Sequence, residues 1–147
     1  MQHACGHLRH LLPLIADSKI DALESVSEAP TGNISIKEIS AILPERIAII
    51  GGIEPTFFIN SGKEELEDRV DFLCDLFQGK RFILANADSC PPQVDIDKFG
   101  IVSRRIHERL GLEMPHIIQF NKNERIKPRG VSEYHGSLSE TRSNKSP

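Results

Sequence analysis

The sequence predicts an α/β fold built around a parallel sheet. Along the chain, apolar residues at helical spacing alternate with short apolar runs, in the order helix, strand, helix, strand, helix, strand, helix. The runs 47–50 and 82–85 are apolar at every position, as in parallel strands buried on both faces. This alternation is typical of βαβ units with right-handed crossovers. A length of 147 residues is enough for one domain with a sizeable core.

The first predicted helix follows Gly6. Its apolar side is formed by Leu8, Leu11, Leu12 and Ile15. Because an interior proline removes a backbone hydrogen bond, Pro13 belongs in the first turn, and the regular helix begins near Leu11. Residues 20–26 then form a predicted strand, which ends in a loop marked by Pro30 and Gly32.

The second helix begins with the capping box Ser35 to Glu38 and ends near Pro44. The strand 46–51 follows. Its end, the turn 51–55, places Glu54 near the carboxyl end of that strand.

A second capping box, Ser61 to Glu64, opens the third predicted helix. The apolar stripe of this helix is Leu66, Val70, Leu73 and Phe77. Cys74 lies beside the stripe and is interpreted as a small core residue. The strand 81–86 and the proline-containing loop 87–92 come next. Asp95 or Asp97 caps the last helix, whose inward residues are Phe99, Val102, Ile106 and Leu110 and whose C-terminal stop is Gly111.

The helix and strand pattern stops after Leu112. We therefore predict a domain at residues 1–112 and, at residues 113–147, a polar tail without periodicity that is mostly disordered. The domain is predicted to be partial, because the chain begins where a strand should be ending and only three full strands follow.

The composition excludes several classes of function. A net charge of -3 gives no basic surface for nucleic acid or an anionic membrane, and the absence of tryptophan argues against base-stacking platforms. No apolar run is long enough to span a bilayer, and the first residues lack the apolar core of a signal peptide. We expect a cytoplasmic protein whose three cysteines are reduced.

The first six residues carry a candidate metal-binding pair. His3 and Cys5 are two positions apart, so on an extended backbone their side chains point to the same side. An imidazole and a thiolate are both ligands of a borderline-soft cation such as Zn²⁺. The pair is half of a metal site, and further ligands would have to come from later in the chain.

Four stretches together resemble the uroporphyrinogen decarboxylase superfamily, which also contains corrinoid-dependent methyltransferases. They are residues 3–6 (His-Ala-Cys-Gly), the strand 20–25, the turn 51–55 (Gly-Gly-Ile-Glu-Pro), and residues 86–92 (Asn-Ala-Asp-Ser-Cys-Pro-Pro). The resemblance runs from residue 3 to about residue 110. It implies a (β/α)₈ TIM barrel of which this chain supplies the C-terminal half, about the last four units, with the first strand truncated.

The resemblance also implies where a site would lie. Active sites of barrels lie at the carboxyl ends of the strands. The residues that fall at such ends are His3, Cys5, Glu24, Glu54, Asp88 and Cys90. In the methyltransferase branch a His-x-Cys pair binds zinc with a third, later ligand. Cys90 or Asp88 would be that ligand here, while Glu24 and Glu54 would line the site as catalytic carboxylates.

Three functional hypotheses follow from the resemblance. The first is zinc-dependent transfer of a methyl group to a small-molecule thiol from a methylated corrinoid carried by a partner protein. The second is decarboxylation of a tetrapyrrole, as in porphyrin biosynthesis; here Asp88 stands where the decarboxylases carry a histidine. The third is a half barrel that is inactive alone, and that self-associates or requires a separate amino-terminal half, because open strand edges invite association.

Overall fold

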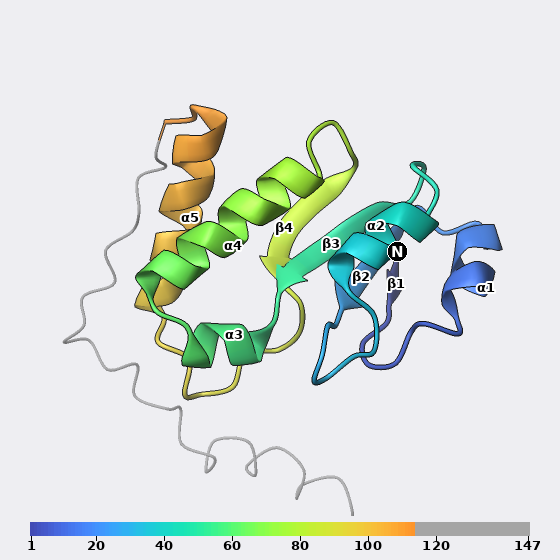
Figure 1. Ribbon diagram of the computed structural model, residues 1–147, viewed down its shortest axis with the longest axis horizontal. Coiled ribbons are helices and arrows are strands. Elements are labelled where there is room, and N and C mark those ends of the chain that lie inside the picture. Colours follow the sequence, from blue (N-terminus) through green and yellow to red (C-terminus); the bar gives the residue numbers. More distant parts are fainter. Residues whose placement is uncertain (114–147) are drawn as a thin grey trace, which may run out of the picture. The chain divides into compact units, whose positions relative to one another are not determined.

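The computed structural model describes residues 1–113, which contain four strands and five helices (Figure 1). In chain order they are β1 (Gln2–His3), α1 (Leu12–Asp17), β2 (Ala22–Val26), α2 (Ile36–Ile42), β3 (Ala48–Ile53), α3 (Pro55–Asn60), α4 (Lys63–Leu76), β4 (Phe82–Asn86) and α5 (Asp97–Leu110). Apart from its first residue, the predicted tail 113–147 lies outside the described residues. None of these five helices has the length and apolar character needed to cross a membrane.

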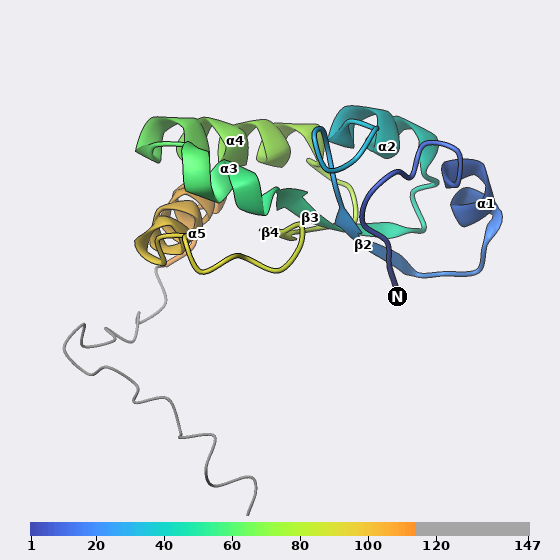
Figure 2. The ribbon, with the colours of Figure 1, turned by 90° about the horizontal axis from the view of Figure 1, so that it is seen from below.

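The four strands form one parallel sheet in the order β1-β2-β3-β4. When parallel neighbours follow one another in sequence, right-handed crossovers carry the connecting helices to the same face. Figure 2 shows α2 and α4 on one side of the sheet. The predicted α/β class is therefore confirmed, and this arrangement is consistent with part of a TIM barrel.

The register of the sheet separates a covered face from an open one. Leu23, Ile49 and Phe82 are aligned across β2, β3 and β4, and Leu23 and Ile49 are buried, as expected of residues that face the helices. The next row contains Ile50 and Ile83, and 56% of Ile83 is exposed. The prediction that these strands are buried on both faces is thus wrong for this row, because the described helices cover only one face.

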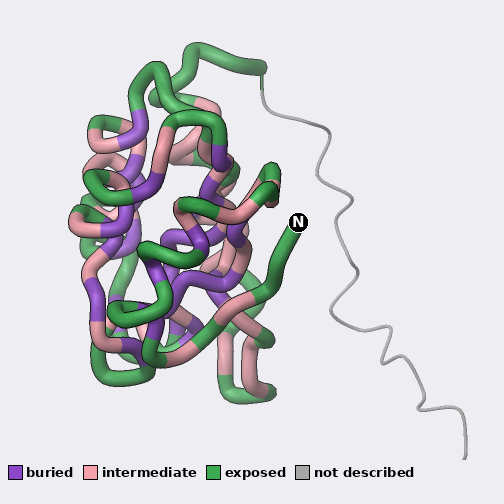
Figure 3. Tube along the Cα trace, turned by 90° about the vertical axis from the view of Figure 1, so that its right-hand side faces the viewer, coloured by how far each residue is buried: buried purple, intermediate pink, exposed green. Residues whose placement is uncertain are grey.

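The core lies between the sheet and the helices. Figure 3 shows buried segments running through the middle of the described trace, with exposed turns around them. The predicted stripe of α4 is confirmed, since Leu66, Val70, Leu73 and Phe77 are all buried. Cys74 is half-buried and packs against this core, as predicted.

The helix ends agree with the sequence in part. Pro13 lies in the first turn of α1, and the Ser35–Glu38 capping box of α2 is present with both hydrogen bonds. The second predicted box is wrong. The N-cap of α4 is Gly62, and its backbone N–H donates to the Glu65 carboxylate at 2.7 Å. Residues 55–60 form α3, which was not predicted, and α3 takes up the residues just before Ser61.

The last helix shows a further difference. Ile96 is the N-cap of α5, and the Asp95 carboxylate accepts the Asp97 backbone N–H at 3.0 Å. Gly111 ends the helix with a φ of 62°, as predicted. Leu110, however, is 58% exposed and does not face inward. Near this end, ion pairs of Arg105 and Arg109 with α4 carboxylates join α5 to α4, while Ile106 packs against the core.

Gly52 in β3 has no room for a side chain. Its φ is +109°, and a Cβ would lie 2.9 Å from Leu73 Cδ1 and 3.1 Å from Phe82 Cζ. We expect Gly52→Ala to lower the free energy of unfolding by about 1–3 kcal/mol, through overpacking and backbone strain. Urea denaturation followed by circular dichroism measures the change.

Gly100→Ala is the matched control. Gly100 lies within α5, and a Cβ there meets nothing within 4 Å. Because alanine is the better helix former, this substitution should raise the free energy of unfolding by about 0.5–1 kcal/mol. Equal effects of the two substitutions would contradict the packing described for Gly52.

Candidate functional site

Five of the six predicted site residues lie at or after the carboxyl ends of strands, and the sixth, Glu24, lies inside a strand. His3 is the last residue of β1, and Cys5 lies two positions beyond it. Glu24 lies within β2, and Glu54 directly follows β3. Asp88 and Cys90 lie in the loop that follows β4. Since parallel strands present their carboxyl ends at one edge of a sheet, five of these residues lie at that edge, whereas Glu24 is the middle residue of β2.

Two of these residues form a direct hydrogen bond. His3 and Glu24 are aligned partners of the parallel β1–β2 ladder, and His3 Nδ1 lies 2.5 Å from Glu24 Oε2. An ionised carboxylate can only accept a hydrogen bond, so pairing with such a carboxylate requires a proton on Nδ1 of the ring. The remaining ring nitrogen, Nε2, is then the one available to a metal ion or a substrate.

Cys5 extends the same segment. His3 and Cys5 are exposed, whereas Ala4 between them is half-buried and packs against the core. The Ala4 backbone N–H donates to the Glu24 carbonyl at 3.0 Å, which continues the pairing of this segment with β2.

A β-bulge at Ser25 in β2 positions a hydroxyl that binds the loop following β4. Ser25 is buried with a φ of 69°, and the ladder slips by one residue between Glu24 and Val26. Bulges often redirect a side chain beside a functional site. Here the Ser25 hydroxyl donates to the Ala87 carbonyl, so β2 fixes the start of the loop that carries Asp88 and Cys90.

The two candidate third ligands differ in their surroundings. Cys90 is half-buried against the apolar core, and this burial raises the pKa of its thiol. The carbonyl of Asp88 accepts a hydrogen bond from the Asn86 side chain at 2.5 Å, and the Asp88 carboxylate accepts the Ser89 backbone N–H at 2.6 Å. The Asp88 carboxylate is thus held by a local hydrogen bond, while the Cys90 thiol lies against apolar side chains, where burial disfavours its thiolate form.

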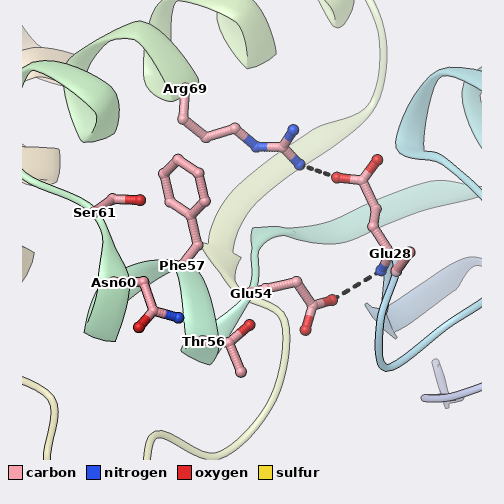
Figure 4. A pocket seen from close by; sticks show the side chains of 8 residues that line it. Glu28, Glu54, Thr56, Phe57, Asn60, Ser61 and Arg69 are labelled. Carbon is pink, nitrogen blue, oxygen red and sulfur yellow. Dashed lines mark hydrogen bonds and ion pairs between the residues drawn. The ribbon is translucent and has the colours of Figure 1, made fainter.

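A cavity of about 200 Å³ lies between the loop after β2 and helix α3 (Figure 4). Its lining residues are Glu28, Ala29, Glu54, Thr56, Phe57, Asn60, Ser61 and Arg69. Arg69 Nε donates to the Gly52 carbonyl at 2.9 Å, and its guanidinium forms an ion pair with Glu28. Glu28 also accepts the Ile36 backbone N–H at 2.8 Å, which ties the start of α2 to this wall.

Glu54 projects into this cavity. Its Oε1 accepts the Glu28 backbone N–H at 2.9 Å, and its side chain does not cap α3 (Figure 4). Burial raises the pKa of the Glu54 carboxyl, hydrogen bonds from the Glu28 backbone N–H and the Ser27 side chain oppose this rise, and the negative charges of Glu28 and Asp88 add to it. The structure thus places Glu54 in a cavity with Glu28 and Arg69 and does not bring it to His3.

Comparison with known protein families identifies the chain. The uroporphyrinogen decarboxylase (URO-D) family matches residues 1–109, which is most of the sequence. The chain belongs to the URO-D family. No curated protein sequence matches it.

For a URO-D family member, the fit of the residues to zinc depends on the donors at the strand ends. His3 and Cys5 supply an imidazole and a thiol, and Glu24 supports the imidazole as carboxylates do for metal-bound histidines. Within residues 1–113, however, no group of three His, Cys, Asp or Glu side chains is placed to hold a metal ion. The chemistry of the pair therefore fits zinc, while a third ligand does not lie beside it in this structure.

Three residues of this region were missed by the sequence analysis. Arg69 had a detectable signal: it lies three residues after Leu66 and four before Leu73, on the buried side of α4, where a charge requires a partner. That partner, Glu28, comes from a loop about 40 residues away in sequence and had no local signal. Ser25 had none either, because its role depends on a positive φ and on the distant Ala87 carbonyl.

The Ser25 hydrogen bond makes a testable prediction about Cys90. We expect Ser25→Ala to raise the rate of Cys90 alkylation by iodoacetamide at least about fivefold, because losing a buried hydrogen bond of about 1 kcal/mol lets the loop open more often. Peptide mass spectrometry measures the rate at each of the three cysteines.

The control for this experiment is Ser89→Ala, an exposed serine in the same loop. The rate of Cys90 alkylation should be unchanged in this variant. The account of the loop would be wrong if Ser25→Ala left Cys90 as protected as in the parent chain, or if it accelerated Cys90 and Cys74 equally.

Proposed function

We propose that this URO-D family chain contributes to a zinc-dependent enzyme that transfers a methyl group to a small-molecule thiol. The observation that carries the proposal is the hydrogen bond of His3 Nδ1 to Glu24, which leaves Nε2 for a metal ion beside the exposed thiol of Cys5. In this proposal His3 and Cys5 hold the zinc ion, and Glu24 orients the imidazole.

The third ligand is proposed to come from the loop after β4. Asp88 and Cys90 are the two candidates, since zinc accepts both carboxylate oxygen and thiolate. Support comes from their position at the same end of the sheet as His3 and from the Ser25 hydrogen bond, which holds the start of this loop against β2. Because the described donors form no group of three, closing the site requires the loop to move toward β1.

The chemistry follows from the charge of the ion. A zinc ion held there would lower the pKa of a bound thiol, so that the substrate carries the nucleophilic thiolate at neutral pH. The methyl donor is proposed to be a methylated corrinoid, carried by a partner protein. In this transfer a sulfur–carbon bond would form as the cobalt–carbon bond of the donor breaks, with the electron pair of that bond left on the corrinoid and the thiol proton released to solvent.

The open face of the sheet supports a proposal about the rest of the active protein. The row that contains Glu24, Ile50 and Ile83 faces away from the described helices, and Ile83 is exposed. We propose that further strands, from an amino-terminal half or from a second copy, cover this face. Residues 1–113 without such a partner would then be an inactive half barrel.

Decarboxylation of a tetrapyrrole is the second candidate function. It is favoured by the description of the matched family, whose model is that of uroporphyrinogen decarboxylase. The hydrogen-bonded His3 and Glu24 side chains would serve proton transfer in such a reaction without a metal ion. Zinc binding therefore distinguishes the two candidates.

The experiment measures zinc binding by the full chain and its variants, using competition with a chromophoric chelator. We expect one zinc ion per chain, and we expect His3→Ala and Cys5→Ala to abolish stoichiometric binding. Glu24→Gln should weaken binding about 10–100-fold, as loss of a carboxylate partner does at other zinc sites. Of Asp88→Asn and Cys90→Ala, one should weaken binding and thereby identify the third ligand.

His10→Ala and Cys74→Ala are the matched controls, because His10 is an exposed histidine outside the strand ends and Cys74 belongs to α4. Both should bind zinc as the parent chain does. A parent chain that binds no zinc, or binds it equally well without His3 and Cys5, would contradict the methyl-transfer proposal and favour decarboxylation.

A further inference from the structure

The cavity beside Glu54 is built separately from the His3–Glu24 pair. Its walls come from the loop after β2, from α3 and from α4, and Figure 4 shows Glu54 and Phe57 on one side with Arg69 and Glu28 on the other. With a volume of about 200 Å³, it is smaller than the cavities that hold drug-sized ligands. It therefore suits a small molecule or one group of a larger one.

The charges around this cavity do not balance. Arg69 forms an ion pair with Glu28, and its Nε and Nη2 both donate to the Gly52 carbonyl. Its positive charge is therefore balanced by Glu28 and does not balance Glu54. Glu54 is half-buried, and no Lys, Arg or His within residues 1–113 forms an ion pair with it.

A half-buried carboxylate without a cationic partner is costly, and a bound cation offsets that cost. The remaining lining residues fit an organic cation better than a hydrated metal ion. The Phe57 ring offers apolar contact, and its face attracts an ammonium group. Thr56 and Asn60 add side-chain oxygens that accept N–H donors.

We propose that this cavity is a binding site for a small organic cation with a primary ammonium group. The ammonium pairs with the Glu54 carboxylate, and the alkyl part lies against Phe57. The inference does not depend on zinc or on the proposed methyl transfer, because none of the residues that carry it is a proposed metal ligand.

Titration of the ¹⁵N-labelled full chain with butylammonium chloride, followed by NMR, tests the proposal. We expect saturable shifts of the backbone amides of Glu28 and of α3, because these groups form the walls. 1-Butanol has the same number of heavy atoms and no charge, and it should bind at least about tenfold more weakly. Potassium chloride keeps the ionic strength constant throughout.

Two variants test the site itself. Glu54→Gln keeps an acceptor for the Glu28 N–H and removes the charge, so butylammonium should bind at least about tenfold more weakly. Thr56→Lys places an ammonium group at the exposed second position of α3, where it should occupy the site and block the probe to a similar degree. The amide spectra also show whether each variant is folded.

Glu64→Gln is the control, because Glu64 is an exposed carboxylate in the first turn of α4. Binding should be unchanged in this variant. The proposal would be overturned by shifts that do not saturate, by equal binding of butanol, or by folded Glu54→Gln and Thr56→Lys variants that bind butylammonium as tightly as Glu64→Gln does.

Discussion

Parallel pairing of β1 with β2 is the constraint on which the candidate site depends. The ladder aligns His3 with Glu24, and the hydrogen bond between their side chains follows from this register. A shift of one residue would send the two side chains to opposite faces of the sheet. The function proposed for His3 therefore depends on backbone hydrogen bonds such as that of Ala4 with Glu24 as much as on the imidazole itself.

The ends of β2 and β3 use unusual backbone conformations to shape the same region. Ser25 adopts a positive φ and thereby reaches the Ala87 carbonyl, while Gly52 leaves space for Leu73 and Phe82 and offers its carbonyl to Arg69. These contacts create two separate polar regions. One contains His3, Cys5 and Glu24 beside the open face, and the other contains the cavity with Glu54.

Much of the fold was predictable because its signals are local. Apolar spacing identified the buried stripe of α4, and the Ser35–Glu38 pair marked the start of α2. Helix α3 was missed because six residues after a glycine-rich turn carry too little periodicity to distinguish a short helix from a loop. Ile83 was predicted to be buried, but its exposure depends on what covers the second face of the sheet, which the apolar run does not encode.

The sequence predicted only that the site residues lie near the ends of strands. The sequence placed Glu24 and Glu54 at such ends but not their partners, because the hydrogen bond of Glu24 to His3 and that of Glu54 to the Glu28 backbone join segments more than 20 residues apart. Arg69 and Glu28 belong to different elements for the same reason. Contacts of this kind depend on tertiary packing, which local sequence patterns do not predict.

The central claim is that His3 and Cys5 bind one zinc ion together. X-ray absorption at the zinc edge, on the full chain loaded with one equivalent of zinc, tests this most directly. The account predicts an imidazole nitrogen and at least one sulfur in the first coordination shell, with the sulfur contribution reduced in Cys5→Ala. A first shell of nitrogen and oxygen alone in the parent chain would contradict it.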